Sequence, residues 1–285
     1  MTVPVRKRIR RSVRSAIIVA AVRLFGLVPL RVALALATVV GRLAWRVSPA
    51  TRRQMLAQLA VAFPEKAPAE REAIARACLV HLAWLAAEVV TVPRLGPWPA
   101  STIAKATIHA GVNVLIEKAR REGGVETLWR EDPATARAMI RCFKRNEILG
   151  ILIDQDTSVQ GVFVPFFGRP AFTPRAVADL ALRFRAPVIV GTCRRRGPNP
   201  GDGHEVTAVE IPYDPDAPDR EAEAVRLTAA CTAVLEEAIR RNPAEWVWMH
   251  ERWRTVPPPA GLALPDPENG PQAKAVPKSA ALSGG

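Results

Sequence analysis

The sequence predicts an α/β fold, in which a mostly parallel sheet is flanked by helices, and an N-terminal helical segment that lies in a membrane interface. Residues 148–153 and 187–192 are continuous apolar runs of strand length, which is typical of buried parallel strands. Helical segments alternate with the strand-like ones, as in a sheet covered by helices. Positive charge concentrated near the N-terminus predicts the membrane segment.

The charge divides the chain into unequal parts. The 285 residues are 49% hydrophobic and 24% charged, which excludes wholesale disorder and a collagen-like chain. The net charge is +13, and twelve of the 40 Lys and Arg residues lie in residues 1–53, before the first acidic residue, Glu65. The remainder therefore has 28 basic and 27 acidic residues. We expect a basic membrane-associating segment over 1–50, an α/β domain over 51–256 and a disordered tail over 257–285.

The basic segment is expected to lie on a membrane rather than to cross it. Its longest uncharged run, residues 32–41, has ten residues, whereas a spanning helix needs about 20. On a helix restarted after Pro29, Arg31, Arg42 and Arg46 fall within about 60° of one another beside aliphatic residues. Such a stripe suits anionic headgroups; the alternative is a buried helix with solvated arginines. No nucleic-acid partner is expected, because stacking aromatic residues do not accompany the basic ones.

The first part of the domain is predicted to be helical. Residues 51–63 form a helix that ends before Pro64, and residues 68–90 form a second helix with apolar residues at helical spacing. His81 and Glu88 lie seven positions apart on the second helix, and we expect an interior pair rather than a catalytic one.

The rest of the domain alternates between predicted helices and strands. Residues 91–101 contain three prolines and a glycine and are expected to be irregular. Asp132 and Thr173 are suited to cap the helices that follow them. The later predicted elements are helices over 103–121, 133–145, 173–184 and 219–241, strands over 125–129, 148–153, 187–192 and 204–211, and an extended aromatic segment over 162–167.

No metal and no cofactor are expected. Cys78, Cys142, Cys193 and Cys231 are far apart, form no CxxC pair and have no His at zinc spacing. We expect reduced thiols that lie mostly in the core.

The strongest local motif is residues 242–254, NPAEWVWMHERWR. Arginine forks match phosphate and indole rings cover apolar surface, so this motif suits a phosphorylated amphiphile. The alternative is an aromatic edge packed on the domain with solvated arginines. Asp154 follows a predicted parallel strand, where ligands bind in such sheets, and capping of the next turn is its alternative. The candidate substrate-binding residues are Asp154, Arg169, Arg175, Trp248, Arg252 and Arg254, with solvated loop and helix positions as the alternative for Arg169 and Arg175.

Several of these segments together form a pattern. They are Ala62-Phe63-Pro64-Glu65, Gly150-Ile151-Leu152-Ile153-Asp154-Gln155-Asp156, Gly161-Val162-Phe163-Val164-Pro165-Phe166-Phe167-Gly168-Arg169-Pro170, Ala186-Pro187-Val188 and the Trp-x-Trp-x-His-x-Arg-Trp-Arg motif of residues 246–254. In order and rough spacing, from about residue 52 to residue 257, the chain resembles the late-stage lipid A acyltransferases, the lauroyl/myristoyl or HtrB-like family.

The resemblance implies a membrane-associated enzyme on the cytoplasmic face of the inner membrane. Its members move a fatty acyl chain from an acyl carrier protein thioester to a hydroxyl of a lipid A precursor. The implied partners are therefore the inner membrane surface, the lipid A precursor and the acyl carrier protein, whose acidity a basic surface would suit.

The family's catalytic pair, a His followed five positions later by Asp or Glu, is absent from the sequence. In that pair the imidazole takes the hydroxyl proton, and the carboxylate orients it and stabilises the imidazolium. The residues five positions after His81, His109, His204 and His250 are Ala86, Val114, Val209 and Thr255. The flanking segments match the family, so an internal deletion near residues 91–103 has removed the motif.

Three explanations of the missing pair remain open. The chain is a deleted or misassembled gene product, a paralogue that kept lipid binding and lost transfer, or an enzyme with another base, for which His250 and His109 are the candidates. The sequence therefore supports two functions: an acyltransferase of lipid A biosynthesis, active or crippled, and a non-catalytic membrane-lipid binding protein on the same scaffold.

Overall fold

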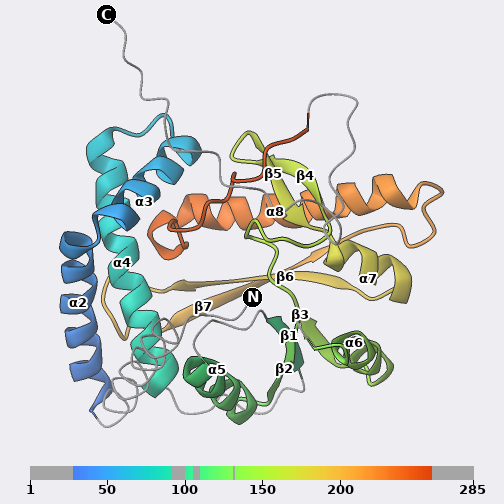
Figure 1. Ribbon diagram of the computed structural model, residues 1–285, viewed down its shortest axis with the longest axis horizontal. Coiled ribbons are helices and arrows are strands. Elements are labelled where there is room, and N and C mark those ends of the chain that lie inside the picture. Colours follow the sequence, from blue (N-terminus) through green and yellow to red (C-terminus); the bar gives the residue numbers. More distant parts are fainter. Residues whose placement is uncertain (1–27, 92–99, 105–109, 131, 259–285) are drawn as a thin grey trace, which may run out of the picture.

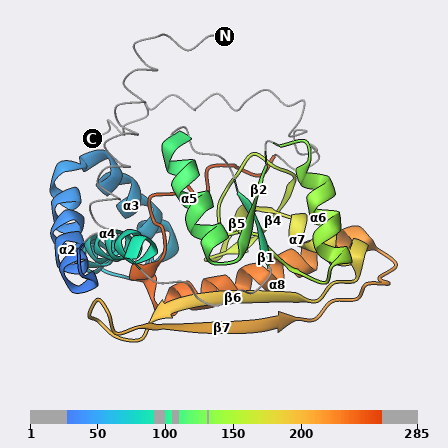
Figure 2. The same cartoon turned by 90° about the horizontal axis from the view of Figure 1, so that it is seen from below.

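The computed structural model describes residues 28–91, 100–104, 110–130 and 132–258 (Figure 1). Much of the predicted basic segment and nearly all of the predicted tail lie outside these ranges. The described elements form three groups, which are an N-terminal layer of helices, a small parallel sheet with a helix on either side, and a long helix packed against two hairpins (Figures 1 and 2).

The N-terminal layer consists of α2 (Leu30–Val47), α3 (Pro49–Ala62) and α4 (Pro68–Thr91). These helices confirm the two that were predicted on either side of Pro64. α2 runs along α4, and small buried residues, Ala33, Ala37 and Gly41, lie on one face of α2. A Cβ atom at Gly41 would lie 2.6 Å from Cα of Val80, so the absence of a side chain sets the distance between the helices.

The outward face of α2 is apolar over most of its length. Its exposed large hydrophobic residues are Leu30, Val32, Leu36, Val39, Val40, Leu43 and Val47. Arg31, Arg42 and Arg46 are exposed beside them. Within the described ranges, no helix is both long enough and apolar enough to cross a membrane.

A three-stranded parallel sheet has the order β2-β1-β3, with strands β1 (Ala100–Ala104), β2 (Val125–Trp129) and β3 (Ile148–Gly150). Helix α5 (Ala110–Glu122) connects β1 to β2, and helix α6 (Thr135–Lys144) connects β2 to β3. The helix predicted over 103–121 begins later than expected, because β-branched Thr102 and Ile103 lie in β1 and pair with β2. Most of the irregular stretch predicted over 91–101 lies outside the described residues; at its ends, Thr91 belongs to α4, and Ala100 and Ser101 belong to β1. The strand predicted over 148–153 is also shorter than expected.

The other strands form two antiparallel hairpins, so the prediction of a mostly parallel sheet holds only for β1–β3. The first hairpin joins β4 (Gly161–Phe166) to β5 (Arg169–Pro174), and the second joins β6 (Val188–Arg195) to β7 (His204–Ile211). Thr173 does not cap a helix, because it pairs with Val162 in the first hairpin. Helix α7 (Ala176–Phe184) therefore begins after the predicted start.

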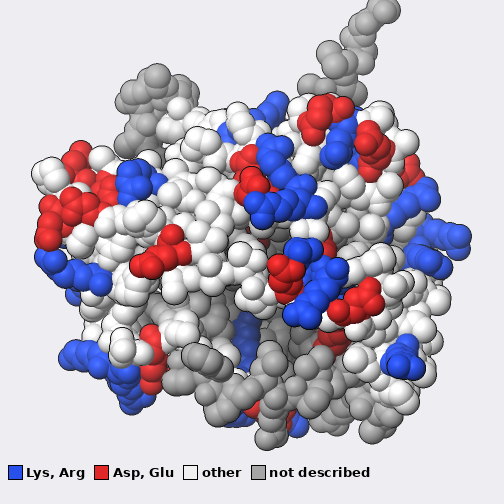
Figure 3. Space-filling model, turned by 180° about the vertical axis from the view of Figure 1, so that it is seen from behind, with Lys and Arg blue, Asp and Glu red and all other residues white. Residues whose placement is uncertain are grey.

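Helix α8 (Arg220–Arg241) confirms the long helix predicted over 219–241. Asp219 caps it by accepting a hydrogen bond from the Ala222 N–H, 2.9 Å away. A short 3₁₀ turn, η1 (Pro243–Glu245), follows. On the molecular face shown in Figure 3, basic and acidic residues lie next to one another, as expected of a nearly neutral domain.

We predict that Gly41→Ala destabilises the protein. The added Cβ would meet backbone atoms of α4, so the helices must separate, and overpacking of this kind costs about 1–3 kcal/mol. The higher helix propensity of alanine offsets about 1 kcal/mol of that loss. Urea unfolding measures the difference, with Ala35→Leu on the exposed side of α2 as a control that should change little. A more stable Gly41→Ala protein would contradict the packing of α2 on α4.

Candidate functional site

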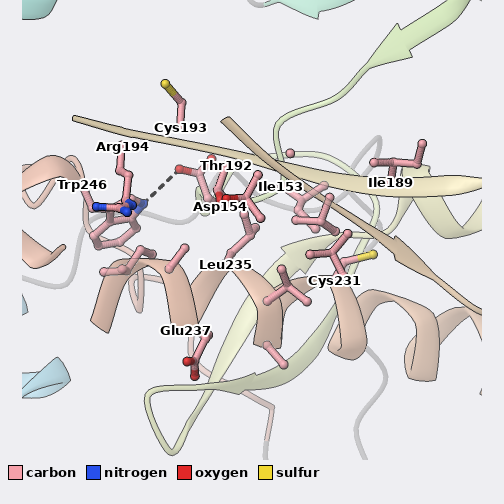
Figure 4. Close-up of a pocket in the computed structure, with 18 of the residues that line it drawn as sticks. Ile153, Asp154, Ile189, Thr192, Cys193, Arg194, Cys231, Leu235, Glu237 and Trp246 are labelled. Carbon is pink, nitrogen blue, oxygen red and sulfur yellow. Dashed lines mark hydrogen bonds between the residues drawn. The ribbon is translucent and has the colours of Figure 1, made fainter. Parts of the chain in front are cut away.

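A large cavity lies between the β6–β7 hairpin, α8 and the segment that follows β3; we call it the β6–α8 cavity (Figure 4). Its volume is about 990 Å³, at the upper end of the range of small-molecule sites. Of its 26 lining residues, 13 are aliphatic and six are charged. The wall includes Ile151, Ile153, Val188, Val190, Val234 and Leu235.

Asp154 supplies a polar group at this cavity. Its Oδ2 accepts a hydrogen bond from Nε1 of Trp246, 3.1 Å away, and both residues line the cavity (Figure 4). Its Oδ1 is buried and has no hydrogen-bond partner among the described residues. A carboxylate oxygen in this condition is available to accept a hydrogen bond from a ligand.

Asp156 holds the C-terminal motif against the same segment. Its Oδ1 accepts hydrogen bonds from Nη2 of Arg254 and Oγ1 of Thr255, each 3.0 Å away. Its Oδ2 accepts another from the backbone N–H of Thr255 at 2.7 Å. The side chain of Arg254 remains about half exposed, so this predicted binding residue is anchored and still accessible.

Arg252 and Trp248 are fully buried. Nη1 of Arg252 donates to the carbonyl oxygen of Phe172 at 2.6 Å, and Nη2 donates to Oγ1 of Thr173 at 2.7 Å. Burial lowers the pKa of Arg252 to about 10, although Asp154 and Asp156 act in the opposite direction. The expected alternative of solvated arginines is therefore wrong for Arg252, whereas Trp248 packs in the aromatic core as that alternative supposed.

The remaining predicted site residues lie apart from the cavity. Arg169 is exposed at the start of β5, and Arg175 forms ion pairs with Asp179 and Glu221. Arg175 is thus not simply solvated. His250 is partly exposed in the turns that follow η1, and His109 lies outside the described residues. Substrate contact by these residues stays a prediction.

A cluster of titratable residues was not foreseen from the sequence. Nη1 and Nη2 of Arg195 donate to Oε1 and Oε2 of Glu88, at 2.5 and 2.7 Å, and both residues are buried. Nε2 of His204 lies 3.5 Å from Oε2 of Glu88. Oε2 of Glu245 accepts a hydrogen bond from the Arg195 N–H at 2.9 Å.

His81 belongs to the same cluster. Burial lowers its pKa, and among the nearby charges Glu245 and Glu88 raise it while Arg195 lowers it. The expected interior pair of His81 and Glu88 is therefore only part of a larger group. Spacing along the sequence predicted only the two members that lie on α4, His81 and Glu88. The other members come from β6, β7 and η1, which are distant in the sequence.

The family comparison adds to this geometry. The sequence profile of the bacterial lipid A biosynthesis acyltransferases matches residues 5–125 and 100–255, well over half of the chain. The chain belongs to this family. No curated protein matches it at a significant level.

Membership in the lipid A acyltransferase family confirms the resemblance read from the sequence. It implies acyl transfer in lipid A biosynthesis, with a lipid A precursor and an acyl donor as substrates. The two matched segments overlap at residues 100–125, next to the predicted deletion near 91–103.

The described residues contain no group of three or more His, Cys, Asp or Glu suited to a metal ion. Cys78, Cys142 and Cys231 are buried, as predicted for most of the cysteines, and Cys193 is exposed.

We predict that Arg252→Met lowers the free energy of unfolding by about 2–4 kcal/mol. Two buried acceptors, the Phe172 carbonyl and the Thr173 hydroxyl, would lose their donor, at about 1–3 kcal/mol each. Urea unfolding tests this, and exposed Arg169→Met is the control that should stay within about 0.5 kcal/mol. Unchanged stability together with weaker lipid binding would instead assign Arg252 to the ligand.

Proposed function

We propose that this chain transfers a fatty acyl group from an acyl carrier protein thioester to a hydroxyl of a lipid A precursor, at the cytoplasmic face of the inner membrane. The observation that carries the proposal is the β6–α8 cavity in a chain of this family. Half of its lining residues are aliphatic, and Oδ1 of Asp154 at its wall has no hydrogen-bond partner among the described residues.

The cavity suits an acyl chain because of its lining. Each methylene that moves from water into an apolar site contributes about 0.8 kcal/mol, so a long chain is bound without specific polar contacts. Asp154 and Trp246 place polar groups beside this apolar space, where a thioester or a hydroxylated headgroup would need them.

The outward face of α2 supports the membrane location. At about 100° per residue, Arg31, Arg42 and Arg46 occupy one strip, and the exposed apolar residues occupy the neighbouring strip. A helix of this kind lies with its apolar strip in the acyl boundary and its arginines at anionic headgroups. The buried face against α4 fixes which strip points outward.

A second function rests on the missing catalytic pair. No histidine in the sequence has an acidic residue five positions later. On that ground the alternative is a membrane-lipid binding protein that keeps the cavity and the α2 surface and transfers no acyl group.

The purified full chain, incubated with acyl-loaded carrier protein and a lipid A precursor, is expected to yield a precursor heavier by one acyl group in mass spectrometry. Thr192→Trp, which places a large ring in the cavity, should reduce the rate at least about tenfold, a loss of 1.4 kcal/mol or more in transition-state binding. Thr192→Val is the matched control. Binding of precursor without any mass increase would support the alternative function.

Membrane binding is tested by flotation with vesicles of anionic phospholipid. Leu36→Glu combined with Leu43→Glu should lower the bound fraction several-fold, because each introduced carboxylate would enter the apolar boundary. Ala60→Glu, which adds a carboxylate to the exposed side of α3, is the control. If the wild-type protein, the double variant and Ala60→Glu float equally well, α2 does not contact the membrane.

A further inference from the structure

The contact of His204 with Glu88 places an imidazole beside a buried carboxylate, the chemical combination that the family's missing motif supplies. The two residues come from β7 and from α4. We infer that His204, oriented by Glu88, is the general base of acyl transfer in this chain. This inference rests on the acyltransferase function proposed above.

The register of the β6–β7 hairpin makes the contact a consequence of the fold. Arg195 and His204 are directly paired across the two strands, so their side chains lie on the same face, about 5 Å apart at Cβ. Both Nη atoms of Arg195 hold Glu88. The carboxylate held in this way lies beside the imidazole of His204.

Glu88 is well placed to orient the imidazole. Its side chain is only 9% exposed, whereas that of His204 is 37% exposed. Nε2 of His204 faces the carboxylate, so Nδ1, on the other side of the ring, is left to accept a proton from a substrate. The second imidazole of the cluster, His81, is less accessible, since its Nδ1 is buried.

The surroundings of Arg195 fix the carboxylate further. The Arg195 guanidinium lies over the ring of Trp84, with its Cζ 5.2 Å from the ring centre. Nε1 of Trp84 donates to Oγ1 of Thr38 in α2 at 2.8 Å. The positioning group is therefore connected to the helix whose outward face we assign to the membrane.

The cluster also borders the β6–α8 cavity. Cys193, on the same face of β6 as Arg195, is among its lining residues, whereas Arg194 and Glu205 belong to the opposite face of the hairpin. Glu245, which accepts the hydrogen bond from the Arg195 N–H, lines it as well. An acyl chain that places its thioester at the Glu245 end of the cavity would bring it next to this cluster.

His204 can both take up and return the proton that acyl transfer moves. The neutral imidazole of His204 takes the proton of the acceptor hydroxyl as its oxygen attacks the thioester carbonyl. The carbon–sulfur bond then breaks, and the imidazolium returns the proton to the leaving thiolate, which gives an ester and a thiol. Glu88 stabilises the imidazolium while it exists.

The test compares the full chain with His204→Ala in the acyl transfer assay. We expect kcat to fall about 10²-fold or more, the usual contribution of a general base, with little change in KM. Imidazole added to the buffer should restore part of the activity of His204→Ala. In the double variant His204→Ala/Glu88→Gln it should restore none, because the carboxylate that holds the imidazole is gone.

Two controls separate catalysis from folding. Glu72→Gln changes an exposed ion pair on the same helix and should leave the activity unchanged. His204→Ala should have the same melting temperature as the wild-type protein, because the side chain of His204 is partly exposed. Glu88→Gln leaves buried Arg195 without its carboxylate partner, so the folded fraction of each variant that carries this change is measured separately.

Several outcomes would overturn the inference. Full activity in His204→Ala, a loss that imidazole does not restore, or a loss in His250→Ala in its place would each exclude His204 as the base while the acyltransferase function stands. A wild-type chain that binds precursor and transfers nothing would remove both proposals together.

Discussion

The buried guanidinium of Arg252 is the group around which the C-terminal half of the domain is organised. A charge removed from water costs several kcal/mol, and hydrogen bonds to its N–H groups offset part of that cost, so the partners of the two Nη atoms of Arg252 are strongly fixed. Its Nε is buried and has no hydrogen-bond partner among the described residues. Its Nη atoms bond β5, its backbone N–H bonds Oε1 of Gln58 in α3, and its guanidinium lies 4.9 Å from the ring centre of Phe166 in β4. Arg252 therefore joins the C-terminal segment to the first hairpin through its side chain and to α3 through its backbone.

The cavity wall depends on the same segment. The residues between β3 and β4 belong to no strand, and side-chain bonds hold them. Trp246 bonds Asp154, while Arg254 and Thr255 bond Asp156. Two motifs that resembled a substrate site in the sequence thus hold each other in place. Of the carboxylate oxygens of Asp154 and Asp156, Oδ1 of Asp154 is the one that has no partner among the described residues.

Local signals in the sequence predicted the helices well and the pairing of strands poorly. The helix predicted over 219–241 matches α8, and Pro64 separated α3 from α4. Thr173-Pro174 carries the signals of a helix start, yet pairing with β4 and the bond to Arg252 keep Thr173 in a strand. Such pairing depends on distant residues, which periodicity within one window does not contain.

In the candidate site too, features that depend on local sequence were predicted and features that depend on distant residues were not. Asp154 was found because the end of a parallel strand is a local feature, although β3 itself proved shorter than expected. Residues 246–254 form no strand, since backbone bonds such as that from the His250 N–H to the Val247 carbonyl produce turns. The burial of Arg252 follows from acceptors in β5, which no property of its own segment reveals.

A histidine and a carboxylate can be brought together by a short spacing along the sequence or by the topology of the fold. The first kind of pair is visible as a sequence motif, and the second is visible only in the structure. In the family motif the histidine and the carboxylate are five positions apart, so the absence of the pair is evident from the residues that follow each histidine. In this chain the separation along the sequence is large, and the strand register of Arg195 and His204 takes its place. Arg195 binds Glu88 through two parallel hydrogen bonds, and the carboxylate held there lies 3.5 Å from the imidazole. The buried ion pair is costly by itself, and the contact with Trp84 and the bond onward to Thr38 tie it to α2. The helix that we assign to the membrane surface and the pair that we assign to proton transfer are thus parts of one rigid arrangement.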